Sequence, residues 1–224
     1  MTASPDRPRR FDLVVFDWDG TLFDSTALIV HSIQAACRDL GLPVPDDERA
    51  SWVIGLSLRS AMEHAVPTIT QEQIPQMVDR YRFHYIARQH DLTLFPGVLD
   101  MLHALKRRHH WLAVATGKSR VGLDEALHTV ELKGLFDGTR TADETRSKPD
   151  PLMLNELMRQ FGADPERTLM IGDTTHDLQL AANAGTPSIA VAYGAHQPSE
   201  FATHSPLLIA HDVAELAAWL EEHA

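Results

Sequence analysis

The stretch that most constrains this chain is an apolar run that ends in two closely spaced carboxylates. Residues 11–16 read Phe-Asp-Leu-Val-Val-Phe, and Asp17, Trp18, Asp19, Gly20 and Thr21 follow directly. A short apolar run bounded by a Gly-containing turn predicts a buried strand. Because open α/β sheets bind ligands at the carboxyl ends of their strands, Asp17 and Asp19 are expected to face a binding crevice.

The rest of the chain predicts alternating strands and helices. Strands are expected over residues 111–115, 139–142, 168–171, 188–192 and 206–210, with helices over 98–105, 119–129 and 175–184, one starting at Pro151 and a last one capped by Asp212. This order predicts an α/β fold with a parallel, doubly wound sheet.

Residues 23–91 differ, because they contain no convincing strand. Helical spacing predicts a helix with Ser25 as its cap and Gly41 at its end, a second helix capped by Asp46, and a third whose regular part starts near Ile74. We therefore expect a catalytic core formed by residues 1–22 and 92–224, with an all-helical cap domain, residues 23–91, inserted after the first strand. Such an insert can act as a lid over the crevice.

Composition narrows the range of partners and compartments. With 224 residues the chain can bury a sizeable core, and its net charge of −11 disfavours nucleic acid as a partner. The single Cys37 cannot form an internal disulfide, which fits a reducing compartment. Residues 1–10 lack the apolar region of a signal peptide, and no apolar run approaches membrane-spanning length, so a cytoplasmic protein without membrane contact is expected.

Four polar segments follow predicted strands or precede helices, and together they carry a family resemblance. They are Asp17-Trp18-Asp19-Gly20-Thr21, Thr116-Gly117, Lys148-Pro149, and Gly172-Asp173 with Asp177 four residues after Asp173. In this order they resemble the motifs of the haloacid dehalogenase superfamily. The resemblance spans the whole chain, with the helical insert where the family places a cap, and it is closest to the phosphoglycolate phosphatase-like branch.

The resemblance implies a role for each residue at the strand ends. Asp17 would attack phosphorus to give an aspartyl-phosphate, while Asp19 would protonate the leaving oxygen and later take a proton from water. The Thr116 hydroxyl and the Gly117 amide would hold the phosphoryl oxygens. Lys148 would add a compact positive charge.

The excess of carboxylates facing a phosphate calls for a divalent cation. Oxygen ligands suit Mg²⁺, which the resemblance assigns to Asp17, the Asp19 carbonyl and Asp173, with Asp177 as an indirect or water-mediated partner. An alternative stays open for the last motif, because Thr174 and Asp177 are also spaced like a helix capping box.

Three residues are candidates for substrate binding outside these motifs. Residues 55–59 align with the substrate-specificity loop of the family, so Ser57 and Arg59 are expected to face the substrate. Arg59 could reach a carboxylate, or it could be an exposed helix arginine. Lys118 lies in a Gly-Lys-Ser sequence similar to the end of a P-loop, but Leu112 stands where the first glycine is required, which leaves Lys118 as a helper only.

The resulting expectation is a magnesium-dependent phosphatase that acts on a small phosphorylated metabolite, with phosphoglycolate as the first candidate. A pyrophosphatase, a nucleotidase or a sugar phosphomutase of the same fold are alternatives, and the oligomeric state is left open between monomer and homodimer. A phospho-accepting signalling module is disfavoured, because its acceptor lies mid-chain without a lid and its phosphate persists, whereas Asp19 would promote hydrolysis.

Overall fold

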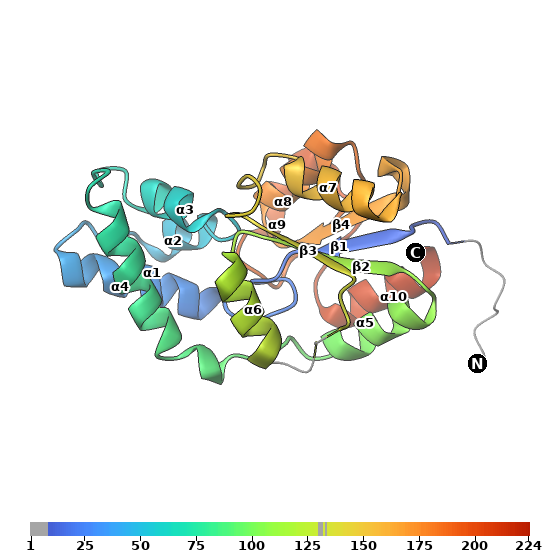
Figure 1. Ribbon diagram of the computed structural model, residues 1–224, viewed down its shortest axis with the longest axis horizontal. Helices are drawn as coiled ribbons and strands as arrows, with labels where there is room; N and C mark the ends of the chain where they lie inside the picture. Colours follow the sequence, from blue (N-terminus) through green and yellow to red (C-terminus); the bar gives the residue numbers. More distant parts are fainter. Residues whose placement is uncertain (1–8, 130–131, 133) are drawn as a thin grey trace.

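A six-stranded parallel sheet forms the centre of the fold (Figure 1). The computed structural model describes residues 9–129, 132 and 134–224; residues 1–8 of the expected core segment, and residues 130, 131 and 133, lie outside the described part. The strands are β1 (Leu13–Phe16), β2 (Trp111–Thr116), β3 (Gly138–Thr141), β4 (Thr168–Gly172), β5 (Ser188–Val191) and β6 (Ile209–Ala210). The α/β prediction is confirmed, although β6 is shorter than the expected strand over residues 206–210.

The strand order explains why polar side chains gather after β1 and β4. The order is β3-β2-β1-β4-β5-β6, so the chain builds outward from β1 to one edge and then returns to the other side of β1. Phe16 pairs with Val114 of β2 and Ile171 of β4, and the Asp17 amide donates to the Ile171 carbonyl at 2.9 Å. The carboxyl ends of β1 and β4 therefore meet at the topological switch point, where such sheets bind ligands.

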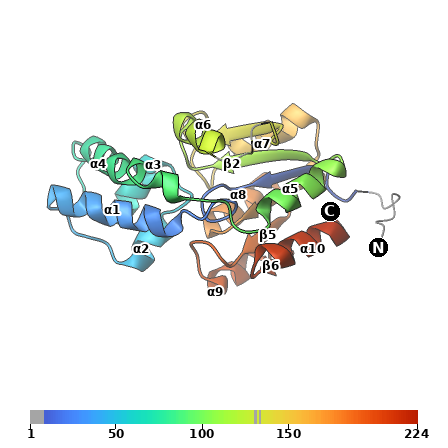
Figure 2. The ribbon, with the colours of Figure 1, turned by 90° about the horizontal axis from the view of Figure 1, so that it is seen from below.

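Helices cover both faces of the sheet (Figures 1 and 2). Alternate residues of β1 point to opposite faces: Val14 and Phe16 pack in a cluster with Leu102 and Leu216, whereas Val15 packs with residues of the helices on the other face. The covering helices are α5 (Val98–Arg107), α6 (Arg120–Thr129), α7 (Leu152–Phe161), α8 (Thr175–Ala184), α9 (Pro198–Phe201) and α10 (Val213–His223). Because both faces of the sheet centre are buried, the central strand β1 is continuously apolar, whereas the edge strand β3 is polar and half-buried.

Four further helices form a group beside the carboxyl edge of the sheet, at the left of Figure 1. They are α1 (Thr26–Leu40), α2 (Asp47–Trp52), α3 (Leu58–Ala65) and α4 (Ile74–Ile86). They share a hydrophobic cluster of their own that includes Ile33, Met62 and Met77. The chain enters and leaves this group at adjacent points, because Phe23 and Leu94 form an antiparallel bridge.

Most predicted helix ends are observed, and one is wrong. Asp46 and Asp212 accept hydrogen bonds from the first turns of α2 and α10, as expected. Gly41 ends α1 with a left-handed backbone. Ser25 precedes α1 but its side chain makes no capping bond, because the hydroxyl donates to Asp19 instead.

Local signals did not predict α3 or the short α9. Ser57 caps α3 by accepting a bond from the Ser60 amide at 3.3 Å, in the stretch that aligns with the substrate-specificity loop. Three 3-10 helices complete the described elements: η1 (Gln89–Asp91), η2 (Pro165–Arg167) and η3 (Ala202–His204). In the part of the chain that the structure describes, no helix has the length and apolar character needed to cross a membrane.

Candidate active site

Three carboxylates from the ends of β1 and β4 converge in the interior. Asp17 follows β1, Asp173 follows β4, and Asp177 lies in the first turn of α8. One carboxylate oxygen of each residue lies within 4.8 Å of the others, and all three side chains are buried. The structure therefore brings together three of the four acidic residues predicted for the site.

Lys148 joins two of these carboxylates. Its ammonium nitrogen lies 2.7 Å from Asp17 Oδ1 and 2.6 Å from Asp177 Oδ1, and its side chain is fully buried. Asp177 Oδ2 accepts bonds from the Thr174 amide (3.1 Å) and hydroxyl (2.7 Å). The capping-box alternative is thus observed, and the same carboxylate that caps α8 also orients the lysine.

Burial and crowding shift the pKa values of this cluster. Burial, followed by repulsion from Asp177 and Asp173, raises the pKa of Asp17 well above its ordinary range, against the attraction of Lys148. Burial and the nearby Asp177 raise the pKa of Asp173 to about 7. Burial alone would lower the pKa of Lys148, but attraction to Asp17 and Asp177 outweighs it and raises that pKa. The cluster holds more negative charge than its one lysine neutralises.

Asp173 is held by the β1 turn and by a loop after β5. Its Oδ1 accepts from the Thr21 hydroxyl and its Oδ2 from the Ala195 amide, both at 2.8 Å. Gly20 has a φ of +80°, and a Cβ there would lie 2.1 Å from Asp173 Oδ2. The glycine after Asp19 is therefore required for both its backbone conformation and the close approach of the two motifs.

Asp19 sits at the border between the buried cluster and the helical group. Its Oδ1 accepts from the Ser25 hydroxyl at 2.7 Å and lies 3.2 Å from Lys118 Nζ. Lys118 also donates to the Tyr85 hydroxyl at 3.2 Å, and its ammonium lies 4.7 Å from the centre of that ring. Asp19 thus has its own cation, separate from Lys148.

The Thr116-Gly117 segment, at the carboxyl end of β2, lies against the loop that precedes α3 in the helical group. Thr116 is buried, and its hydroxyl accepts from the Lys118 amide at 3.2 Å. A Cβ at Gly117 would lie 2.3 Å from the Leu56 carbonyl oxygen and 2.5 Å from that of Gly55. Only glycine allows the loop before α3 to approach the end of β2 this closely.

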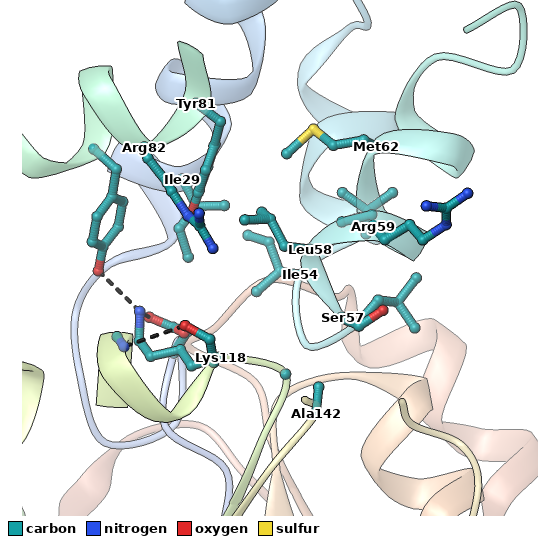
Figure 3. Close-up of a pocket in the computed structure, with 18 of the residues that line it drawn as sticks. Ile29, Ile54, Ser57, Leu58, Arg59, Met62, Tyr81, Arg82, Lys118 and Ala142 are labelled. Carbon is teal, nitrogen blue, oxygen red and sulfur yellow. Dashed lines mark hydrogen bonds and ion pairs between the residues drawn. The ribbon is translucent and has the colours of Figure 1, made fainter. Parts of the chain in front are cut away.

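A cavity of about 670 Å³ lies between the helical group and the end of the sheet (Figure 3). Asp19, Gly117 and Lys118 line it on the sheet side. The helical group contributes mainly apolar side chains: Ile29, Ile33, Val53, Ile54, Leu56, Leu58, Met62, Tyr81, Tyr85 and Ile86. Asp17 does not line this cavity and is only 1% exposed, so the carboxylate at the end of β1 is shielded from solvent.

Ser57 and Arg59, the predicted substrate-binding residues of the helical insert, line the cavity, but their polar groups bond to other residues of the helical group. Arg59 Nε lies 3.2 Å from Glu63, and its guanidinium also donates to Gln71, so Figure 3 shows it directed away from Lys118. Ser57 contributes its hydroxyl to the start of α3. Roles of Ser57 and Arg59 in substrate binding stay predictions.

Sequence reasoning missed several side chains that complete this site. Arg82 of α4 points toward the centre of the cavity in Figure 3, and Tyr85, one turn later, holds Lys118. Tyr81 and Tyr85 lie four residues apart, and this spacing by itself predicts only that they share one face of a helix. The signal for Ser25 is its position close to the first motif. The six-residue spacing from Asp19 matches no local hydrogen-bonding pattern, so the bond between the two side chains could not be predicted.

The carboxylate cluster fits a divalent cation. Both side-chain oxygens of Asp17 are buried without a hydrogen-bond partner, although Lys148 lies beside one of them. Buried polar atoms normally have partners, so Asp17 Oδ2, which is not the oxygen beside Lys148, points to a ligand that the protein does not itself supply. An all-oxygen set suits a hard cation such as Mg²⁺ rather than a soft metal.

Comparisons with known proteins agree with this arrangement. The family model of the haloacid dehalogenase-like hydrolases matches residues 14–191. The chain is 35% identical to "Probable phosphatase IndB" of Dickeya dadantii, over 91% of each chain, and 30% identical to a phosphoglycolate phosphatase of Mannheimia succiniciproducens, over 92% of this chain and 97% of that one. A solved hydrolase from Pseudomonas syringae superposes with a TM-score of 0.86 at 25% identity, covering 94% of this chain and 98% of the other.

Proposed function

Because the chain belongs to the haloacid dehalogenase-like hydrolases and is a phosphatase of their phosphoglycolate phosphatase-like branch, we propose that it hydrolyses a small organic phosphomonoester through an aspartyl-phosphate on Asp17. The observation that carries this proposal is the pairing of Asp17 with Lys148 at 2.7 Å beside two further buried carboxylates. A carboxylate held by a lysine is oriented for attack, and the positive charge faces the position of the phosphoryl group.

The two aspartates after β1 have different roles: Asp17 is the nucleophile, and Asp19 is the general acid and base. Asp17 attacks phosphorus and forms the acyl phosphate as the leaving oxygen departs. Asp19, which lines the cavity where the leaving group would lie, donates a proton to that oxygen and then accepts one from the water that hydrolyses the intermediate. Ser25 and Lys118 hold Asp19 in place for both steps.

The neighbouring residues hold the phosphoryl group and a cation. Thr116 and Gly117 offer a hydroxyl and an amide at the end of β2, next to Asp19 across the sheet edge. We assign Asp17, the Asp19 carbonyl and Asp173 as ligands of Mg²⁺, which would neutralise the phosphoryl oxygens when bound. We assign Asp177 to orient Lys148, because its Oδ1 lies 2.6 Å from the ammonium nitrogen of that lysine and its Oδ2 caps α8.

The helical group, residues 23–91, serves in this proposal as a cap. Its loop carbonyls at 55 and 56 press on Gly117, and Asp17 is shielded, so the structure corresponds to a closed arrangement. Substrate entry then requires the cap to move away from the ends of β1 and β2. Phosphoglycolate is the first substrate to assay, with pyrophosphate, nucleotides and sugar phosphates as the alternatives.

The test is phosphate release from p-nitrophenyl phosphate with and without Mg²⁺. Asp17→Asn should abolish turnover while keeping the fold, because an amide is a poor nucleophile, and exhaustive chelation should stop the wild-type enzyme. Asp12→Asn is the matched control: this carboxylate lies at the opposite end of β1, paired with Arg167, and its loss should leave turnover intact. Turnover by a folded Asp17→Asn variant would refute the nucleophile assignment, and full activity after chelation would refute the metal.

A further inference from the structure

The cavity between the cap and the sheet is larger and more apolar than glycolate requires. Its volume of about 670 Å³ lies in the range of ~300–1,000 Å³ that encloses drug-sized ligands. Ile54 comes from the segment between α2 and α3, Leu58 and Met62 from α3 and Tyr81 from α4, and Figure 3 shows them around one space above Lys118. These walls offer hydrocarbon and aromatic surface to a bound molecule.

Two of the basic side chains that line this cavity, Lys118 and Arg59, already have partners and are not free to bind a second anionic group of a substrate. Lys118 is paired with Asp19 at 3.2 Å and bonded to Tyr85. Arg59 is paired with Glu63 and Gln71 and points away. Binding a carboxylate inside the cavity would require breaking one of these pairs or using Arg82, which is exposed and points toward the centre of the cavity. It would also place a charge against apolar walls, which costs free energy.

We propose, resting on the phosphatase function above, that the preferred substrate is a phosphomonoester whose leaving group is an apolar or aromatic body, rather than the small anion glycolate. The phosphate reaches Asp17 past Asp19 and Gly117, and the apolar body packs against Ile54, Leu58 and Tyr81. The bond broken is the phosphorus–oxygen bond to that body, which leaves as an alcohol with the proton from Asp19.

The experiment measures kcat/KM for unbranched alkyl phosphates from methyl to octyl, and for phosphoglycolate. Each methylene that becomes buried should raise kcat/KM about fourfold until the cavity is filled. Phosphoglycolate should rank below butyl phosphate. A flat series, or a preference for phosphoglycolate over butyl phosphate, would overturn the proposal.

Variants test whether the named wall provides the preference. Leu58→Asn places an amide in the wall and should lower the octyl-to-methyl ratio of kcat/KM at least tenfold. Leu40→Asn is the control, because Leu40 is also half-buried on the cap cluster but does not line the cavity, and its ratio should equal that of the wild type. The readout is the ratio of two kcat/KM values measured on the same sample, so a partial loss of folded protein lowers both values equally and leaves the ratio unchanged.

The outcomes separate this inference from the function on which it rests. If p-nitrophenyl phosphate and every alkyl phosphate are inert, the phosphatase proposal fails. If methyl and p-nitrophenyl phosphate turn over but chain length has no effect, only the substrate class fails. If Leu58→Asn and Leu40→Asn lower the ratio equally, the wall assignment is wrong.

Discussion

Replacing Lys148 with methionine should cost the protein much of its stability, because the lysine is the shared partner of two buried carboxylates. Its ammonium lies 2.7 Å from Asp17 and 2.6 Å from Asp177, and both partner side chains are at most 1% exposed. Methionine is unbranched like lysine, keeps most of the side-chain length and removes the charge, so the change acts mainly on electrostatics. The two carboxylates then face each other without compensation in the interior.

The magnitude follows from the burial of the pair. Breaking a buried ion pair by removing one partner typically costs ~3–5 kcal/mol. For a chain of this length each kcal/mol lowers the melting temperature by ~2–4 °C, so a fall of roughly 6–20 °C is expected. The loss should shrink at low pH, because the pKa of Asp17 is already raised by burial and its carboxyl can become neutral by protonation.

The assay is thermal unfolding followed by circular dichroism, in the presence of a chelator so that no cation replaces the lysine. Arg146→Met is the control: Arg146 pairs with Asp150 at 3.2 Å but is 73% exposed, and exposed pairs contribute at most about 1 kcal/mol. The double variant Lys148→Met/Asp177→Asn should recover part of the loss, because it removes one of the two unpaired charges. Equal melting temperatures for Lys148→Met and the wild type would refute the reasoning.

Two further predictions concern Asp19 and His110. Asp19→Ala should slow phosphoenzyme formation ~10²–10⁴-fold for an alkyl phosphate and far less for p-nitrophenyl phosphate, whose leaving group needs no proton; rapid mixing should then show a burst of nitrophenolate, and equal slowing for both substrates would contradict the acid role. His110 donates from Nδ1 to the Phe11 carbonyl, its Nε2 is buried without a partner, and burial lowers the pKa of His110 to about 4. The pKa of His110 is lower in the folded than in the unfolded protein, so the stability that neutral His110 contributes is complete above pH ~6.5 and is lost as the pH falls toward ~4. The melting temperature of His110→Leu should therefore decline less steeply than that of the wild type between pH ~6.5 and ~4. Parallel curves for the two proteins would contradict this prediction.

The features that the sequence by itself determined are those that depend on residues close together in the chain. The apolar run before Asp17 predicts a strand from its composition alone, and the carboxyl-end position of Asp17 follows from chain direction. Asp46 and Asp212 could be recognised as helix caps because their bonds reach only to the next turn of the same chain. Gly41 ends α1 for an equally local reason, since glycine accepts the left-handed backbone there.

Parallel strands also allowed part of the site to be assembled before the structure was known. Their carboxyl ends share one edge of the sheet, so Asp17 and Asp173 had to be near each other. Lys148 and Asp177 were placed beside them only through the motif order, and the ion pairs at 2.7 and 2.6 Å are a finding of the structure.

The tertiary structure decided the partners that no local rule encodes. Ser25 was expected to cap α1, but its hydroxyl donates to Asp19, six residues earlier in the chain. Lys118 binds Asp19 and Tyr85, residues that lie far from it in the sequence. Arg59 is held by Glu63 and Gln71 on the surface of the helical group. Such contacts depend on how the helical group packs against the sheet, and residue spacing carries no information about that packing. The shape and the apolar lining of the cavity therefore emerge only from the folded chain.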